Sequence, residues 1–172
     1  IVTYDTQNDL ALLKGNFRPS TVFPLTNNRP ELLQDVYVAG FPFGNKVSTS
    51  VKVTKGIISS LTGIGNNFSN IQIDAALQSG NSGGPILDDL GNVVGVAVSK
   101  LDAKYMFDNF GSIPENTNFG IKSNVVRNII EGSSVDRKLA TSVVKHLASA
   151  QVSANFCSRR TGVRNHTSAR VV

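Results

Sequence analysis

Tryptophan is absent from this sequence of 172 residues, and cysteine and methionine each occur once. The single cysteine, Cys157, excludes an internal disulfide framework. No apolar run approaches the roughly 18–20 residues that a membrane-spanning helix needs, so we expect no membrane span. The sequence also lacks a phosphate-binding loop, a dinucleotide fingerprint and a metal-spaced cluster of histidine, cysteine and acidic residues. We therefore expect no metal and no cofactor.

Charge is scarce and unevenly placed. Charged residues make up only 17% of the chain, too few for a coiled coil or a charge-rich disordered protein. The net charge of +5 comes from residues 133–172, which carry seven basic residues and one acidic residue, whereas residues 1–132 have a net charge of −1. Such a tail can attract nucleic acid or anionic membranes, but Phe156 is its only aromatic residue for base stacking. We interpret it as a solvated segment and expect no nucleic-acid partner.

Residues that favour strands dominate the middle of the chain. Between Val36 and Val98, runs of valine, isoleucine and threonine alternate with clusters of glycine, asparagine and aspartate, which is typical of short strands joined by turns. The expected strands are Asp35–Gly40, Ser48–Leu61, Ile71–Asp74, Gly84–Asp88, Val93–Ser99 and Asn118–Lys122. Short strands followed by a helix predict an all-β fold with a small antiparallel barrel.

Turns and helices are expected around these strands. Residues 88–92 read as a hairpin turn. Ser123 is expected to cap a helix over residues 124–131, where apolar residues recur at helical spacing. A second helix is expected over residues 135–150, and disorder after Ser153.

The segment DAALQSGNSGGP, residues 74–85, carries the strongest chemical signal. Gly80, Gly83 and Gly84 surround Ser82 and permit backbone torsions that are closed to other residues. Such a loop can direct successive N–H groups into one concavity. Ser82 is then placed for nucleophilic attack, and the N–H groups of Gly80 and Ser82 are placed to hold an oxyanion. On these residues alone, an ordinary glycine-rich turn is an equal alternative.

Five segments in order resemble the chymotrypsin-fold serine peptidases, most closely the bacterial HtrA/Deg-type enzymes. They are Asp9–Lys14 (DLALLK), Val38–Gly44 (VAGFPFG), Val53–Ser60 (VTKGIISS), the region around Ser82, and Asn118–Val126 (NFGIKSNVV). This resemblance covers about residues 1–131. It implies a chymotrypsin-like antiparallel β-barrel with a C-terminal helix.

The resemblance also implies a division of the chain. A remnant of the first barrel with the catalytic-aspartate turn is expected at residues 1–14 and an inter-barrel linker at residues 15–34. The complete second barrel and its closing helix are expected at residues 35–131, and a basic helical or disordered tail at residues 132–172.

The resemblance assigns catalytic roles to individual residues. It implies that Ser82 is the nucleophile of a serine endopeptidase and that Asp9 is the buried acid of its triad. Gly80, Asn81 and Ser82 are implied to line the oxyanion hole. Peptides or unfolded proteins are the implied substrates, and export to a periplasmic or extracellular location is implied as well. The oligomeric state is left open.

The order of the triad raises a difficulty. In the family the histidine precedes the aspartate, whereas His146 and His166, the two histidines here, both follow Ser82. We therefore expect an N-terminally truncated fragment that lacks its base and is nearly inactive. The start Ile1-Val2 is similar to that of activated trypsins, but Asn81 replaces the aspartate that such a start pairs with, so we expect no activation of that kind. The alternatives are a non-catalytic chymotrypsin-fold module that binds peptides or partners, and a basic-tailed interaction protein.

The resemblance also bears on specificity. Ala76 stands six residues before Ser82, where trypsin-like enzymes have the base of the primary pocket, and Leu77 follows it. An apolar base leaves a cationic side chain unpaired, so cleavage is expected after small or medium apolar residues and not after Arg or Lys. The strand edge expected to pair with substrate main chain consists of Val96, Ala97, Val98 and Ser99.

Overall fold

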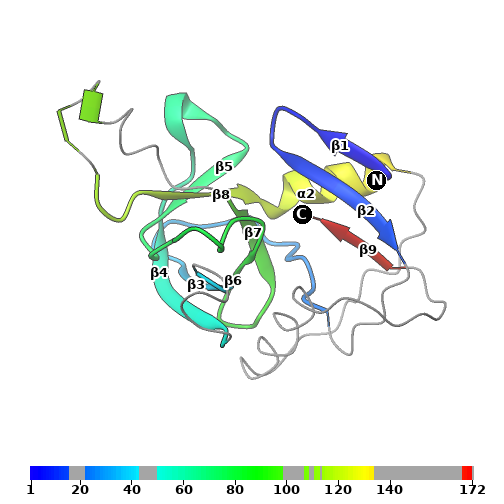
Figure 1. Cartoon of the computed structure of the whole chain (residues 1–172), viewed down its shortest axis with the longest axis horizontal. Helices are drawn as coiled ribbons and strands as arrows, with labels where there is room; N and C mark the ends of the chain where they lie inside the picture. The colour runs from blue at the N-terminus through cyan, green and yellow to red at the C-terminus, as the bar shows by residue number, and fades with distance from the viewer. Residues whose placement is uncertain are drawn as a thin grey trace.

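A closed antiparallel barrel and a separate three-stranded sheet make up most of the fold (Figure 1). The computed structural model describes residues 1–15, 22–42, 50–98, 107–108, 111–112, 114–133 and 168–171. In Figure 1, helix α2 (Ser123–Gly132) continues from the end of β8 and runs behind strands β1 and β2 of the small sheet. Among the described residues, no helix is long and apolar enough to cross a lipid bilayer.

Six strands close the barrel in the order β3-β4-β5-β8-β7-β6, and every neighbouring pair is antiparallel. Closure leaves no free edge along the paired residues. The strands are β3 (Asp35–Gly40), β4 (Lys52–Ser60), β5 (Asn70–Ile73), β6 (Pro85–Leu87), β7 (Val93–Ala97) and β8 (Asn118–Lys122).

The barrel interior is a single apolar cluster. Along β3 and β5 its members occupy alternate positions, as a half-buried β pattern requires, and the segment after β5 adds two more. The members are Val36, Val38, Ile58, Ile71, Ile73, Ala75, Leu77, Ile86, Val94 and Ala97. The interior positions are therefore mainly apolar.

The second sheet has the order β1-β2-β9, with β1 at Thr3–Asp5, β2 at Leu10–Gly15 and β9 at Ser168–Val171. Helix α2 contacts β1 and β2 as well as β7 and β8. A second buried cluster fills this region, with members from β2, β7, β8 and α2. They are Leu10, Leu12, Val96, Ile121, Val126 and Ile130. Helix α2 thus joins the small sheet to the barrel wall.

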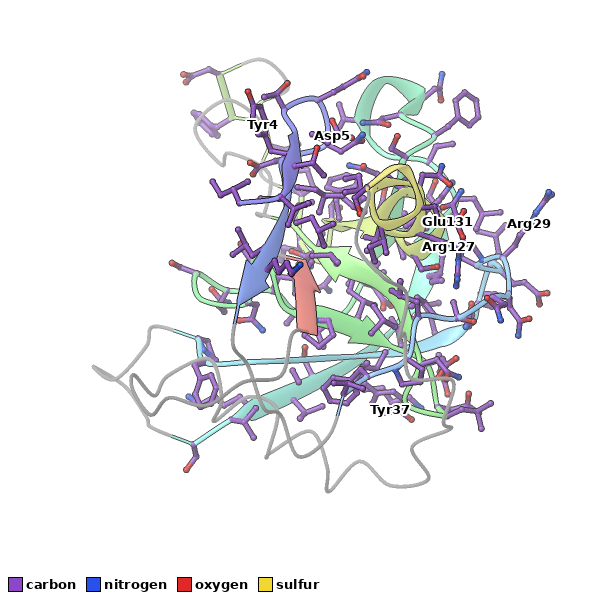
Figure 2. The ribbon with its side chains drawn as sticks, turned by 90° about the vertical axis from the view of Figure 1, so that its right-hand side faces the viewer. Tyr4, Asp5, Arg29, Tyr37, Arg127 and Glu131 are labelled. Atoms are coloured by element: carbon purple, nitrogen blue, oxygen red, sulfur yellow. The ribbon has the colours of Figure 1, made fainter. Side chains whose placement is uncertain are left out.

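The segment that leads into the barrel is held by main-chain and arginine hydrogen bonds. Thr26 donates its N–H to Val93 at 3.0 Å, and the N–H of Val93 donates to Pro24 at 2.8 Å. Arg127 on α2 donates from Nη2 to the carbonyl oxygen of Thr26 at 2.8 Å (Figure 2). These contacts fix the connection against the barrel without making it a strand.

The all-β barrel with a C-terminal helix is confirmed. Strands β3 and β8 have the predicted bounds, and the other four barrel strands lie within one residue of the predicted ranges or inside them. The hairpin turn over residues 88–92 is also confirmed, since the N–H of Asp88 donates to the carbonyl oxygen of Asn92 at 2.9 Å. The expected helix over residues 135–150 and residue Cys157 lie outside the described residues.

Two expectations are corrected. Ser123 is the first residue of α2 and is buried, so it does not cap the helix; β8 runs directly into α2 and Lys122 takes the cap position without a side-chain hydrogen bond. The prediction of disorder after Ser153 is wrong for the four residues of β9, which pair with β2. Leu10 and Leu12 of the small sheet are buried against α2.

Candidate active site

Ser82 lies in the loop between β5 and β6, and it is exposed. Gly80, two residues before Ser82, and Gly83, directly after it, have left-handed backbone torsions, with φ of 102° and 77°. Residues other than glycine rarely adopt the left-handed region of backbone torsions. The local requirement for glycine therefore explains why the sequence around the serine is so rich in this residue.

Backbone hydrogen bonds hold this loop against β7. Gly83 donates its N–H to the carbonyl oxygen of Ala97 at 2.8 Å, and Ala97 donates to Gly84 at 2.9 Å. Gly84 donates in turn to Asn81 at 2.9 Å. The main chain just after Ser82 is thus fixed to the barrel wall while the serine itself stays accessible.

Gly84 is required for close packing rather than for an unusual torsion. A Cβ atom at this position would lie 2.8 Å from the carbonyl oxygen of Asn81 and 2.9 Å from that of Ala39. Both distances are shorter than any real Cβ contact, and both neighbours are main-chain atoms. A side chain at Gly84 would therefore push the loop off the barrel.

Asn81 anchors the serine loop to the end of β3. Its side chain is buried, with 2% exposed, and it packs on Gly40, where a Cβ atom would approach Asn81 to 3.2 Å. Among the described residues, no donor reaches its Oδ1 atom. The residue thus ties the serine loop to the end of β3.

The predicted oxyanion residues differ in what their N–H groups do. The N–H of Asn81 donates to the carbonyl oxygen of Gln78 at 3.0 Å, so it is engaged in a turn. In the described part of the chain, neither Gly80 nor Ser82 donates its N–H to another group. Of the three predicted residues, Gly80 and Ser82 therefore offer the available donors.

Asp9 lies in the turn between β1 and β2, with a left-handed φ of 52°, and it is exposed. This corrects the expectation of a buried acid, because none of the described elements covers the turn. The turn itself is organised by Asp5 (Figure 2), whose Oδ1 accepts from the N–H groups of Gln7 at 2.9 Å and Asn8 at 3.1 Å. The side-chain amide of Asn8 also donates to Asp5 Oδ2 at 2.6 Å. Hydrogen bonds from the side chain and then the backbone of Asn8 lower the pKa of Asp5.

The two predicted pocket residues are in different environments. Ala76 is exposed, and its carbonyl oxygen accepts a hydrogen bond from Thr54 Oγ1 at 2.9 Å. Leu77 is 3% exposed and belongs to the barrel core. Of the two, only Ala76 has a side chain that an approaching molecule can reach.

The expected substrate-pairing edge needs a correction at its start. Strand β7 lies between β6 and β8, and Ala97 uses both its N–H and its carbonyl oxygen within the barrel. Val96 is likewise paired on both sides and is buried. The N–H of Val98 donates to Phe119 at 3.0 Å, and Ser99 lies outside the described residues. Val96 and Ala97 are thus not a free edge, because the closed barrel supplies both of their neighbours.

One buried polar residue near this loop was not predicted. Asn118, 1% exposed, donates from Nδ2 to the carbonyl oxygen of Ala75 at 2.9 Å. Within the described residues its Oδ1 has no partner. The sequence did carry a signal that could have revealed this residue: Asn118 is a polar residue at the start of the apolar run NFGI.

No imidazole accompanies Ser82 in the described part of the chain, since His146 and His166 both lie outside it. The same part of the chain contains no group of three or more histidine, cysteine, aspartate or glutamate residues that could hold a metal ion. The described part of the chain therefore supplies no histidine base for Ser82.

Comparisons with known proteins identify the family of this chain. Residues 1–96 match the family model of the trypsin-like peptidase domain. An uncharacterized protein, y4bJ, of Sinorhizobium fredii is 39% identical over 122 residues, which cover 71% of this chain and 19% of that protein. The serine endoprotease DegS of Salmonella typhimurium is 31% identical over 136 residues, which cover 76% of this chain and 36% of DegS.

A solved structure, the serine endoprotease from Yersinia pestis, is also similar, with 30% identity and a TM-score of 0.49 over 64% of this chain and 34% of that one. The chain thus spans about a third or less of the length of the relatives it matches.

Proposed function

Since the chain belongs to the family of trypsin-like peptidase domains, we propose that it is the nucleophile-bearing part of a serine endopeptidase. Ser82 is the proposed nucleophile and Asp9 the proposed acid. The observation that carries the proposal is the exposed Ser82 in a loop whose backbone is hydrogen-bonded to β7. The available N–H groups of Gly80 and Ser82 support an oxyanion site beside it.

The proposed reaction passes through an acyl-enzyme. Oγ of Ser82 attacks the scissile carbonyl carbon while a base takes the hydroxyl proton. The carbonyl oxygen becomes an oxyanion, which the N–H groups of Gly80 and Ser82 stabilise. The C–N bond then breaks, the amine leaves with the proton from the base, and water hydrolyses the ester to regenerate Ser82.

We propose that these 172 residues supply the nucleophile and the acid but not the base. In the family order the base precedes the acid, whereas His146 and His166 follow Ser82. A triad enzyme without its base keeps only the small rate enhancement that comes from the oxyanion hole and from binding. The chain alone is therefore expected to be nearly inactive.

The proposed substrates are peptides or unfolded proteins. The exposed, apolar Ala76 gives no partner to a cationic side chain, which supports cleavage after small or medium apolar residues. Val98 and Ser99 remain the proposed positions for pairing with substrate main chain, because they follow the last residue of β7.

Chemical rescue tests the proposal on the chain as it is. Free imidazole can take the place of a missing catalytic histidine, so it should increase acylation of Ser82 by an activated ester, followed by mass spectrometry of the intact protein. Ser82→Ala should abolish the rescue and Asp9→Ala should weaken it. Ser79→Ala is the matched control, because Ser79 is an exposed serine of the same loop and should leave the rescue unchanged.

The alternative is a non-catalytic module of the same fold that binds peptides. The exposure of Asp9 favours it, because a triad acid acts from a buried position. Under this alternative, imidazole at any concentration gives no acylation that depends on Ser82, while extended apolar peptides still bind the chain.

A further inference from the structure

The residues that follow β5 lead to the serine loop and alternate between the barrel core and the surface. Ala75 and Leu77 are 1% and 3% exposed and belong to the core cluster, whereas Ala76 between them is exposed. Because both neighbours are held in the core, the methyl group of Ala76 is directed outward. Ala76 is the proposed base of the primary pocket, so the contacts that fix it bear on specificity.

Strand β4 lies directly against the start of this segment. A Cβ atom at Gly56 would meet the amide nitrogen of Ala75 and lie 2.6 Å from its Cα atom, closer than real Cβ contacts. The N–H of Ile57 donates to Asp74 Oδ1 at 2.6 Å, and the N–H of Asp74 donates to the carbonyl oxygen of Ile57 at 3.2 Å. The main chain just before Ala76 is therefore seated on β4 with no free space between them.

Two side chains hold the next two carbonyl groups. Asn118 Nδ2 donates to the carbonyl oxygen of Ala75 at 2.9 Å in the buried interior. Thr54 Oγ1, on β4, donates to the carbonyl oxygen of Ala76 at 2.9 Å in a more exposed position. Among the described residues, no backbone N–H reaches either oxygen. Thr54 is thus the donor that this part of the chain provides for the carbonyl of the pocket base.

We propose that Thr54 determines the polarity of the primary pocket by holding the carbonyl oxygen of Ala76. The inference rests on the proposed function, in which Ala76 is the base of that pocket. The carbonyl oxygen and the Cβ atom of one residue are close neighbours by covalent geometry, so this oxygen lies beside the methyl group at the pocket base. Without the Thr54 hydroxyl, the oxygen is an acceptor for a donor on the substrate. With the hydroxyl in place, a substrate side chain meets chiefly the methyl group.

Valine and threonine in the substrate, at the residue before the cleaved bond, separate these two states of the pocket. The two side chains have nearly the same shape and differ in the hydroxyl group. The parent pocket should prefer valine, because a threonine hydroxyl loses water there without gaining an acceptor. Thr54→Val keeps the shape of residue 54 and frees the Ala76 carbonyl, so binding of threonine should improve. Thr54→Ser keeps the donor and should keep the preference for valine.

Binding of product-like peptides measures this preference without catalysis. The tripeptides Ac-Ala-Ala-Val and Ac-Ala-Ala-Thr end in the free carboxylate of a cleavage product, and each is titrated against the full chain by NMR. The parent chain and Thr54→Ser should bind the valine peptide about fivefold or more tightly than the threonine peptide. Thr54→Val should reduce the ratio to about twofold or less. Thr62→Val is the matched control, since Thr62 is a half-buried threonine whose Oγ1 lies 3.4 Å from Ser60 Oγ, and it should keep the parent ratio.

The outcomes separate this inference from the peptidase assignment. An unchanged ratio in Thr54→Val, whether both affinities stay the same or fall together, would overturn the role of Thr54 in specificity and leave the assignment standing. If the parent chain binds neither peptide, the pocket assignment fails and the inference fails with it, whereas the imidazole rescue judges Ser82 separately. Thr54→Ala removes the same hydroxyl and should also reduce the ratio, so it decides if Thr54→Val does not fold.

Discussion

Asn118 donates a hydrogen bond from Nδ2 to the carbonyl oxygen of Ala75 at 2.9 Å, and both residues are 1% exposed. The bond joins the first residue of β8 to the segment that runs from β5 toward Ser82. A buried carbonyl without a donor is costly. The contact therefore holds the approach to the serine loop against the barrel.

Replacing Asn118 with alanine should lower the free energy of unfolding by roughly 1–3 kcal/mol, because the carbonyl of Ala75 loses its donor inside the protein. Urea denaturation measures the change. Asn124→Ala is the matched control, since Asn124 is exposed on α2, and it should stay within about 0.5 kcal/mol of the parent chain. Equal stabilities of the two variants would show that the Asn118 bond contributes nothing.

Gly84→Ala should destabilise the protein by at least roughly 1–3 kcal/mol, because its Cβ would meet two carbonyl oxygens inside 3.0 Å. The variant should also expose the amides of Gly83 and Ala97 to faster hydrogen exchange, since the loop must move off β7. Gly132→Ala is the control, because a Cβ there meets nothing within 4 Å. Intact exchange protection in Gly84→Ala would mean that the loop adapts without leaving the strand.

Local features made most of the barrel predictable. The bounds of β3 and β8 could be predicted because apolar, strand-favouring runs end at glycine or at the helix start. The start of α2 was misplaced by one residue because Ser123 has the composition of a cap but is buried as the first helical residue. Strand β9 was missed because its pairing with β2 joins distant segments, and no local period reveals such a partner.

In the candidate site, too, local features were predictable and features that depend on tertiary packing were not. The glycines around Ser82 were predictable, since their torsions and close contacts are requirements of a few adjacent residues. The resemblance to HtrA/Deg-type peptidases is confirmed by the similarity to DegS. The exposure of Asp9 and the pairing of Ala97 on both sides were not predictable, because each depends on which elements pack nearby.

Leu33 combines a left-handed φ of 66° with 76% exposure. A side chain in this region is strained by roughly 1–2 kcal/mol, while the greater freedom of glycine in the unfolded chain costs about 0.5–1 kcal/mol. Leu33→Gly should therefore leave the stability unchanged or raise it by up to about 1 kcal/mol.

The neighbouring Leu32 provides the control for this substitution. It is 57% exposed, and its φ is not positive. Leu32→Gly should lower stability by about 0.5–1 kcal/mol, because no strain is relieved. Thermal unfolding of both variants measures the contrast, and a loss at Leu33 as large as that at Leu32 would contradict the role of strain.

The turn before β2 should depend on pH through Asp5. Its pKa is lowered by hydrogen bonds from the Asn8 side chain, the Asn8 backbone and Gln7. A carboxyl whose pKa is lower in the folded state stabilises that state above its unfolded pKa of about 3.9. The contribution should be complete above that pH and should disappear as the pH falls through the folded value.

Asp5→Asn isolates this effect, because an asparagine keeps one acceptor for the Gln7 and Asn8 amides but does not titrate. The difference in unfolding free energy between the parent chain and Asp5→Asn should be constant near neutral pH. It should shrink as the pH drops below about 4, since protonation of Asp5 makes the two side chains more alike. Carboxyl NMR of the folded chain supplies the direct measurement, and a pKa for Asp5 at or above its usual range would show that the turn does not depend on the charged form.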